Sequence, residues 1–135
     1  MLVNKVDWPD DFWKFPQGGL DASEDLVEGA QREFKEEVGT SNFEVIGISK
    51  YGNTDDWDKV KDLKSIQEKK AKGQIQKFLV VKFLGEYSDI KPDGEEIEKV
   101  DWVTAETLRR YTKENKELFH AYNGLIPKIL EEFRF

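Results

Sequence analysis

Residues 13–40 read WKFPQGGLDASEDLVEGAQREFKEEVGT, and the rest of the chain is organised around this stretch. A glycine pair precedes a segment whose apolar residues recur every four positions, which predicts an amphipathic helix from Glu24 to Val38. We expect Ser23 to cap its start and Gly39 to cap its end. Three glutamates gather beside the buried stripe of this helix: Glu33, Glu36 and Glu37. Because like charges repel, the cluster indicates a positively charged partner.

The simplest interpretation of such glutamates is a solvated helix face supported by lysines one turn further on. No lysine lies four residues after Glu36 or Glu37, so that interpretation explains the cluster poorly. Hard divalent cations such as Mg²⁺ or Mn²⁺ bind carboxylate oxygens and keep waters and substrate phosphates as further ligands. Two such ions can clamp a phosphoanhydride and generate hydroxide from bound water. The cluster therefore predicts a metal site that acts on phosphate.

Composition narrows the class of protein. The chain has 135 residues, 38% of them hydrophobic, and a formal net charge of −7, which predicts one domain over residues 1–135 with a well-solvated surface. The acidity argues against a general electrostatic grip on nucleic acid, while a polyphosphate held through metal ions fits it. There is no cysteine, no secretory signal and no apolar run of the ~20 residues that cross a bilayer. We expect a cytoplasmic protein without membrane contact.

Hydrophobic patterning places the remaining elements. Strands are predicted at residues 2–6, 12–15, 43–50, 76–84 and 97–103, and the strand at 76–84 is the most apolar of them. The polar segment 51–72 is long for a loop, and apolar residues three apart within it indicate a short helix: Trp57, Val60, Leu63 and Ile66. A helix capped by Thr104 follows, and residues 118–133 form a last helix that Pro127 kinks or restarts. This order predicts an α/β fold with helices on a mixed sheet.

The spacing of the central stretch matches a known signature. Gly18, five residues, Glu24, seven residues and then REFKEEVG from Arg32 to Gly39 resembles the motif of the Nudix hydrolase family, with Thr40 as the one departure. The family hydrolyses nucleoside diphosphates linked to another moiety and uses Mg²⁺ or Mn²⁺. The resemblance implies that the three clustered glutamates are metal ligands and that a backbone carbonyl around Gln17 or Gly18 completes the shell. It implies a structural ion pair between Glu24 and Arg32.

Three further segments resemble one subgroup of this family. Residues 13–19, WKFPQGG, look like the WQFPQGG of the RNA pyrophosphohydrolases and dinucleoside polyphosphate hydrolases. Residues 73–78, GQIQKF, are similar to GQKQKWF of the same subgroup, and residues 96–103 resemble its E-F-x-x-W-x-W-V strand. By that match Glu96 is a fourth acidic metal ligand or the general base, with Glu95 and Glu98 as close alternatives.

Several side chains are candidates for substrate contacts. Lys77 would neutralise a phosphate, the alternative being an outward-facing strand lysine, and Lys5 is a second phosphate candidate. Gln74 and Gln76 would contact base or phosphate, or alternate outward from the strand. Tyr51 and Trp57 would stack on a nucleobase, although aromatic residues near a core more often pack. His120 is expected to have no catalytic role.

The resemblance implies a strand before Leu2 that this sequence does not contain. Either the sequence begins part-way through the domain, or another chain, such as a second copy, covers the exposed sheet edge. We expect hydrolysis of a nucleoside polyphosphate, at the 5′-triphosphate end of RNA or in a dinucleoside tetraphosphate. The alternative is a non-catalytic Nudix-fold module that binds a nucleotide or a protein.

Overall fold

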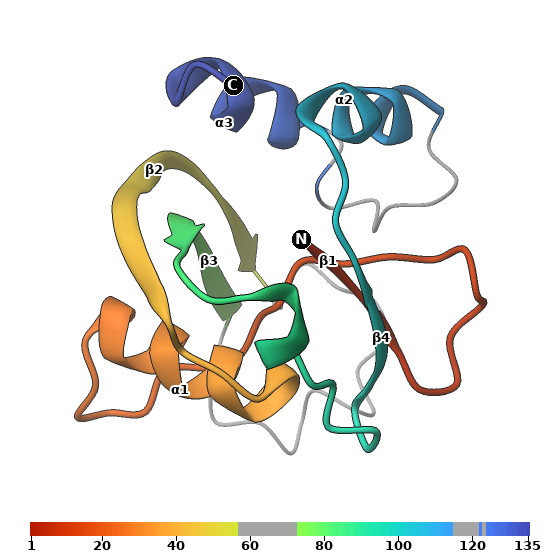
Figure 1. The fold of residues 1–135 in the computed structure, drawn as a ribbon. Coiled ribbons are helices and arrows are strands. Elements are labelled where there is room, and N and C mark those ends of the chain that lie inside the picture. Colours follow the sequence, from red (N-terminus) through yellow and green to blue (C-terminus); the bar gives the residue numbers. More distant parts are fainter. Residues whose placement is uncertain (57–72, 115–121, 123) are drawn as a thin grey trace.

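The computed structural model describes residues 1–56, 73–114, 122 and 124–135. Along the chain the elements are β1 (Leu2–Lys5), α1 (Leu26–Val38), β2 (Phe43–Asp56), β3 (Gly73–Phe83), the short 3₁₀ helix η2 (Tyr87–Asp89), β4 (Ile97–Asp101), α2 (Ala105–Glu114) and α3 (Ile126–Glu132). Figure 1 shows α2 and α3 on one side of the strands and α1 on the other. The predicted α/β class is confirmed. No helix among these residues is long and apolar enough to cross a membrane.

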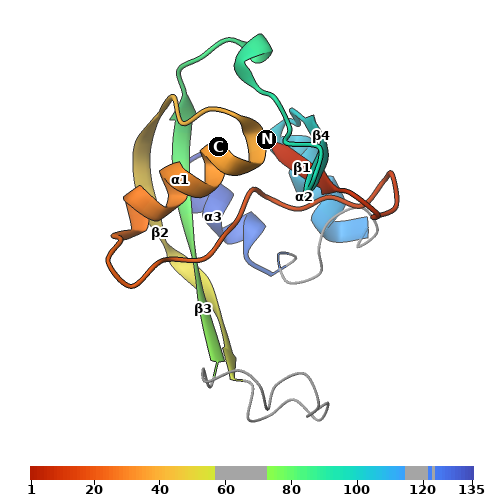
Figure 2. The same cartoon turned by 90° about the horizontal axis from the view of Figure 1, so that it is seen from below.

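The strands pair differently from the predicted single mixed sheet. Within the described ranges, β1 pairs antiparallel with β4, and β2 pairs antiparallel with β3, which gives two sheets of two strands. Figure 2 shows β2 and β3 as one long ribbon that reaches beyond α1. An apolar pattern predicts that a strand exists, but its partner depends on how the whole chain folds, so the sequence did not reveal this division.

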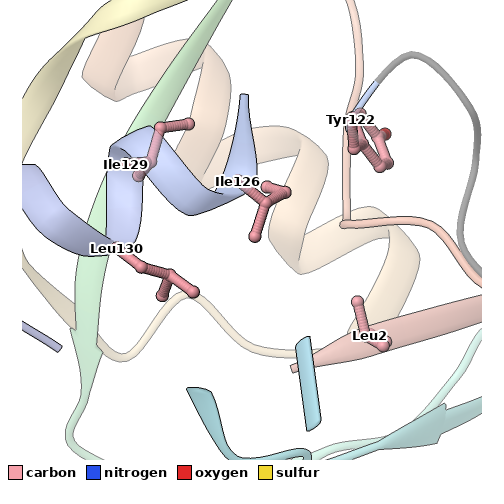
Figure 3. Close-up of a cluster of buried hydrophobic side chains, with 5 residues drawn as sticks. All are labelled: Leu2, Tyr122, Ile126, Ile129 and Leu130. Atoms are coloured by element: carbon pink, nitrogen blue, oxygen red, sulfur yellow. The ribbon is translucent and has the colours of Figure 1, made fainter. Parts of the chain in front are cut away.

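Two clusters of buried side chains hold the elements together. The first joins Leu2 of β1 to one face of α3, and Figure 3 shows its members: Leu2, Tyr122, Ile126, Ile129 and Leu130. The second joins β1, the end of α1, the loop before β4 and β4 itself: Val3, Val38, Ile90 and Ile97. Because Val38 directly follows Glu37, the second cluster fixes the glutamate-bearing end of α1 against β1 and β4.

Helix α1 begins later than predicted. Its N-cap is Asp25, whose carboxylate accepts hydrogen bonds from the backbone N–H groups of Val27 and Glu28, at 2.8 and 2.9 Å. The Glu28 carboxylate in return accepts from the Asp25 N–H, so the two residues form a capping box that Ser23 cannot match. The predicted cap at Ser23 is therefore wrong, and Glu24 lies before the helix. The predicted C-cap is confirmed, with Gly39 at φ 82°.

Several other boundaries also move. Strand β1 ends at Lys5, and the strand predicted at 12–15 is reduced to isolated bridge residues, with Lys14 bridged to Val3. The strand predicted at 43–50 continues as β2 to Asp56, so the first residues of the polar segment 51–72 belong to a strand. Pro127 lies in the first turn of α3, where its missing N–H costs nothing, so the predicted restart of a helix at this proline is confirmed. The predictions at Trp57, Val60, Leu63, Ile66, Leu118, Phe119 and His120 fall outside the described residues.

Candidate active site

An ion pair ties the glycine-containing turn to helix α1. The Arg32 guanidinium donates to both oxygens of Glu24, at 2.7 Å from Nε and 3.0 Å from Nη2. Its Nη2 also donates to the Gly19 carbonyl at 2.7 Å, while the Glu24 carboxylate accepts from the Asp21 N–H. The arginine hydrogen bonds lower the pKa of Glu24 to about 2, with help from the Asp21 N–H. This two-point contact fixes the turn before the helix, as the resemblance implied.

The same arginine also forms ion pairs with two glutamates of the cluster. Its Nη1 lies 2.8 Å from the Glu33 carboxylate and 3.3 Å from the Glu36 carboxylate. The Glu33 carboxylate accepts a further hydrogen bond, from the Gly19 N–H at 3.1 Å. A Cβ at Gly18 would lie 1.7 Å from the Glu33 Cδ, so only glycine leaves room for the Glu33 side chain. Arg32 thus supplies part of the positive charge that the cluster requires.

Glu37 is buried and has a different partner. Its Oε1 accepts from the ammonium of Lys14 at 2.8 Å, and its Oε2 accepts from the Gln17 N–H at 3.1 Å. Both side chains of the ion pair are about 95% covered. Burial raises the pKa of the Glu37 carboxyl, and the hydrogen bond from Lys14 opposes that rise. The sequence did not identify Lys14 as a site residue, because the lysine lies 23 positions from its partner.

Glu96 joins the same group of charges from the loop before β4. Its carboxylate lies 2.8 Å from the Lys5 ammonium and 3.7 Å from that of Lys14, so Lys14 lies between Glu37 and Glu96. The hydrogen bond from Lys5 lowers the pKa of Glu96. Of Glu95, Glu96 and Glu98, it is thus Glu96 for which the described residues show an ion pair with Lys14, the partner of Glu37.

Asp93 explains why the loop presents Glu96. Its carboxylate accepts hydrogen bonds from three successive backbone N–H groups, of Glu95, Glu96 and Ile97, at 3.0, 3.0 and 2.8 Å. The loop is also tied to α1, because the Asp93 N–H donates to the Glu37 carbonyl. Asp93 fixes the loop register as it enters β4. The Pro-Asp-Gly turn was visible in the sequence, but this role of Asp93 was not.

A cavity of about 150 Å³ lies beside Lys14 and Glu96, and it is lined by Lys5, Trp8, Lys14, Gln17 and Glu96. A second, broader groove of about 1230 Å³ runs past Glu33 and the Gly18 turn along β3. Gln17 lines both spaces, so the turn that follows the WKFP lead-in separates the small polar cavity from the larger and mostly apolar groove.

Comparison with known proteins agrees with this arrangement. The family model described as "NUDIX domain" matches residues 2–122. The chain belongs to the Nudix family. Its curated Nudix relatives include a protein named RNA pyrophosphohydrolase from Bartonella henselae, which is 38% identical over 128 residues, covering 90% of this chain and 70% of that protein. Proteins of the same name from Pelagibacter ubique and Gluconobacter oxydans are 31% and 30% identical, covering 96% and 98% of this chain and 82% and 78% of the relatives.

Membership of the Nudix family confirms the enzyme class expected from the sequence, a hydrolase acting on pyrophosphate bonds. Nudix hydrolases generally use divalent metals, and the donor chemistry fits, because carboxylate oxygens are the ligands that hard cations take. As the side chains lie, no three acidic groups of the described residues converge on one point. The carboxylates instead form ion pairs, Glu33 and Glu36 with Arg32, and Glu37 with Lys14.

The predicted substrate residues of this Nudix chain are spread more widely. Lys77 is exposed on β3 and lines the broad groove with Gln76, whose amide contacts Gln17 at 3.4 Å. Gln74 also belongs to β3. Tyr51 packs against the first core cluster, with the Lys50 ammonium 5.0 Å from its ring centroid. Lys5 lies beside Glu96 in the small cavity, which brings it closer to the acidic site than the sequence indicated.

Proposed function

We propose that this Nudix hydrolase removes pyrophosphate from the 5′-triphosphate end of RNA and leaves a 5′-monophosphate. The observation that carries the proposal is the meeting of Glu37, from α1, with Glu96, from the loop before β4, beside a cavity that also contains Lys5. Carboxylates for a cation and an ammonium for a phosphate are thus adjacent. The choice of RNA rests on the names of relatives that align over most of their length.

The residues that would hold Mg²⁺ or Mn²⁺ are those that the resemblance to the family signature implies: Glu33, Glu36, Glu37, Glu96 and the backbone carbonyl of Gly18. When bound, the ion would neutralise charge on the substrate phosphates and acidify water. When no ion is bound, Arg32 would keep the Glu33 and Glu36 side chains oriented. Glu24 and Gly39 would have structural roles: Glu24 pairs with Arg32, and Gly39 ends helix α1.

The chain's own residues would then carry the proton and the phosphates. Hydrolysis forms a bond from a water oxygen to phosphorus, breaks the bridging P–O bond and releases pyrophosphate. Glu96 would take the proton from the attacking water, because its carboxylate is half exposed at the cavity. Lys5 would lie against the charge that develops on the phosphate oxygens. Lys77 and Gln76, with Gln74 and Tyr51 as further candidates, would contact the nucleotides along the broad groove.

The test is turnover of defined substrates. RNA with a 5′-triphosphate and diadenosine tetraphosphate are each incubated with the protein and Mg²⁺ or Mn²⁺, and released pyrophosphate and cleaved nucleotides are measured. We expect hydrolysis of the RNA end, its loss in Glu37→Gln, and full activity in Glu131→Gln, a matched change at an exposed position on α3. In Glu96→Gln we expect kcat to fall by a larger factor than the Mn²⁺ affinity, because the proposed main role of Glu96 is to accept the proton from the attacking water.

The other outcomes separate the alternatives. Turnover of diadenosine tetraphosphate alone would replace RNA as the substrate. Binding of either compound without turnover by the wild type would favour a non-catalytic nucleotide-binding module. Hydrolysis that survives Glu37→Gln would contradict the assignment of the site.

A further inference from the structure

Lys14 places a positive charge in the interior of the acidic site. The residue is only 4% exposed, and its ammonium lies 2.8 Å from the Glu37 carboxylate and 3.7 Å from that of Glu96. Its backbone is fixed by two hydrogen bonds with Val3 of β1, from the Val3 N–H at 2.8 Å and to the Val3 carbonyl at 2.9 Å. The side chain therefore extends into the site from a rigid anchor and does not reach in from the surface.

A buried ammonium is costly unless carboxylates compensate it. Here two carboxylates face Lys14, and both oxygens of Glu37 are used, one by Lys14 and the other by the Gln17 N–H. Glu96 has a second cation, Lys5, and Asp93 adds further negative charge nearby. The position between Glu37 and Glu96 is thus one that a cation stabilises, and the chain fills it with its own side chain.

We propose that the Lys14 ammonium takes the place of one divalent metal ion between Glu37 and Glu96, so that the protein binds fewer metal ions, or binds them more weakly, than its carboxylates would otherwise allow. This inference rests on the proposed function only in taking these glutamates as metal-binding groups. The lead-in that this chain resembles, WQFPQGG, has glutamine where Lys14 stands, so the charge is a feature of this sequence. The same comparison makes glutamine the natural replacement.

The test measures metal binding in the absence of substrate. Free Mn²⁺ is followed by electron paramagnetic resonance during titration of the wild type, Lys14→Gln and Lys99→Gln. The last variant removes the same charge from an exposed lysine that pairs with Asp10 instead. We expect Lys14→Gln to bind one more Mn²⁺ per chain, or to bind Mn²⁺ at least tenfold more tightly, because the two carboxylates lose their internal counter-charge. Lys99→Gln should behave as the wild type.

A second measurement uses the wild type alone, so it does not depend on how a variant folds. Lysine acetylation is mapped by mass spectrometry with and without saturating Mg²⁺. We expect Lys14 to stay protected in both conditions, while exposed Lys77 is modified in both. Labelling of Lys14 only when Mg²⁺ is present would show that the metal must displace the ammonium, and it would support the weaker-binding form of the proposal. Labelling of Lys14 without Mg²⁺ would show that the ammonium does not fill the position between the glutamates, and it would overturn the proposal.

Equal Mn²⁺ stoichiometry and affinity in the wild type and Lys14→Gln would overturn the proposal as well. This failure is distinct from failure of the proposed function. RNA hydrolysis by the wild type combined with unchanged Mn²⁺ binding in Lys14→Gln would reject only the role of Lys14. A gain of Mn²⁺ in Lys14→Gln without any hydrolysis by the wild type would support that role and reject the activity.

Discussion

Replacing Gly18 with alanine tests whether Glu33 lies where the structure places it. An added Cβ would lie 1.7 Å from the Glu33 Cδ and 2.3 Å from its Cγ, so the glutamate must adopt another rotamer. Its carboxylate then leaves Arg32 Nη1, at 2.8 Å, and the Gly19 N–H, at 3.1 Å. These bonds are partly exposed, so we expect their loss to lower the free energy of unfolding by about 1–2 kcal/mol.

The effect on the site should be larger than the effect on stability. If Glu33 binds metal as proposed, displacing it should reduce both Mn²⁺ affinity and kcat/KM at least tenfold. Gly19→Ala is the matched control, because a Cβ there meets no described atom within 4 Å and the residue has no positive φ. Thermal unfolding by circular dichroism, Mn²⁺ titration and pyrophosphate release measure the three quantities. If Gly18→Ala and Gly19→Ala gave the same values in all three assays, the placement of Glu33 would be refuted.

Three further predictions concern the frame around the site. Gly39→Ala should lower the free energy of unfolding, measured in urea, more than Gly94→Ala does. Both changes place alanine at a positive φ, which costs about 1–2 kcal/mol, but only at Gly39 does the new Cβ also meet a backbone oxygen, at 3.0 Å. Equal losses would contradict the crowding at the helix end. Because Arg32 lowers the pKa of Glu24 to about 2, the stabilisation from this pair is complete above about pH 4.5 and is lost as the pH falls towards 2. Urea unfolding of Glu24→Gln should show a weaker loss of stability over that range than the wild type does. Ile97→Ala, at a position with 0% exposure, should lower the free energy of unfolding by about 2–5 kcal/mol, and a loss below 1 kcal/mol would contradict its place in the core.

The parts of the site that sequence could predict are those set by local spacing. Glu33 and Glu37 share a flank of α1 because they are four residues apart, and Gly39 ends the helix because few other residues adopt its positive φ. The contact between Glu24 and Arg32 spans eight residues, and the signature supplied it where periodicity could not. The prediction of Ser23 as the N-cap was wrong because Asp25 is a better cap: it forms a capping box with Glu28 three residues later, and Ser23 does not.

The parts that sequence could not predict depend on which distant segments meet. Whether Glu95, Glu96 or Glu98 would face the helix was open, because a shift of one residue in a loop changes which side chain is presented. Asp93 fixes the backbone of this loop by accepting three successive N–H groups at the entry to β4, and in that register Glu96 pairs with Lys5 and Lys14. The division of the strands into two sheets is of the same kind, since each strand was visible and its partner was not.

The positive charge that balances the acidic cluster is a further feature that depends on which distant segments meet. Reasoning from helix spacing looks for a lysine four residues away and, finding none, assigns the whole charge to metal and substrate. Arg32 lies four residues before Glu36 and next to Glu33, so helix spacing already offered that part of the positive charge. The part that only the fold supplies is Lys14, which reaches Glu37 across 23 residues. Part of the negative charge of the cluster is therefore compensated before any ligand arrives, which helps a folded chain to tolerate it. A metal ion must then compete with these side chains, so they contribute to setting how many ions this site binds.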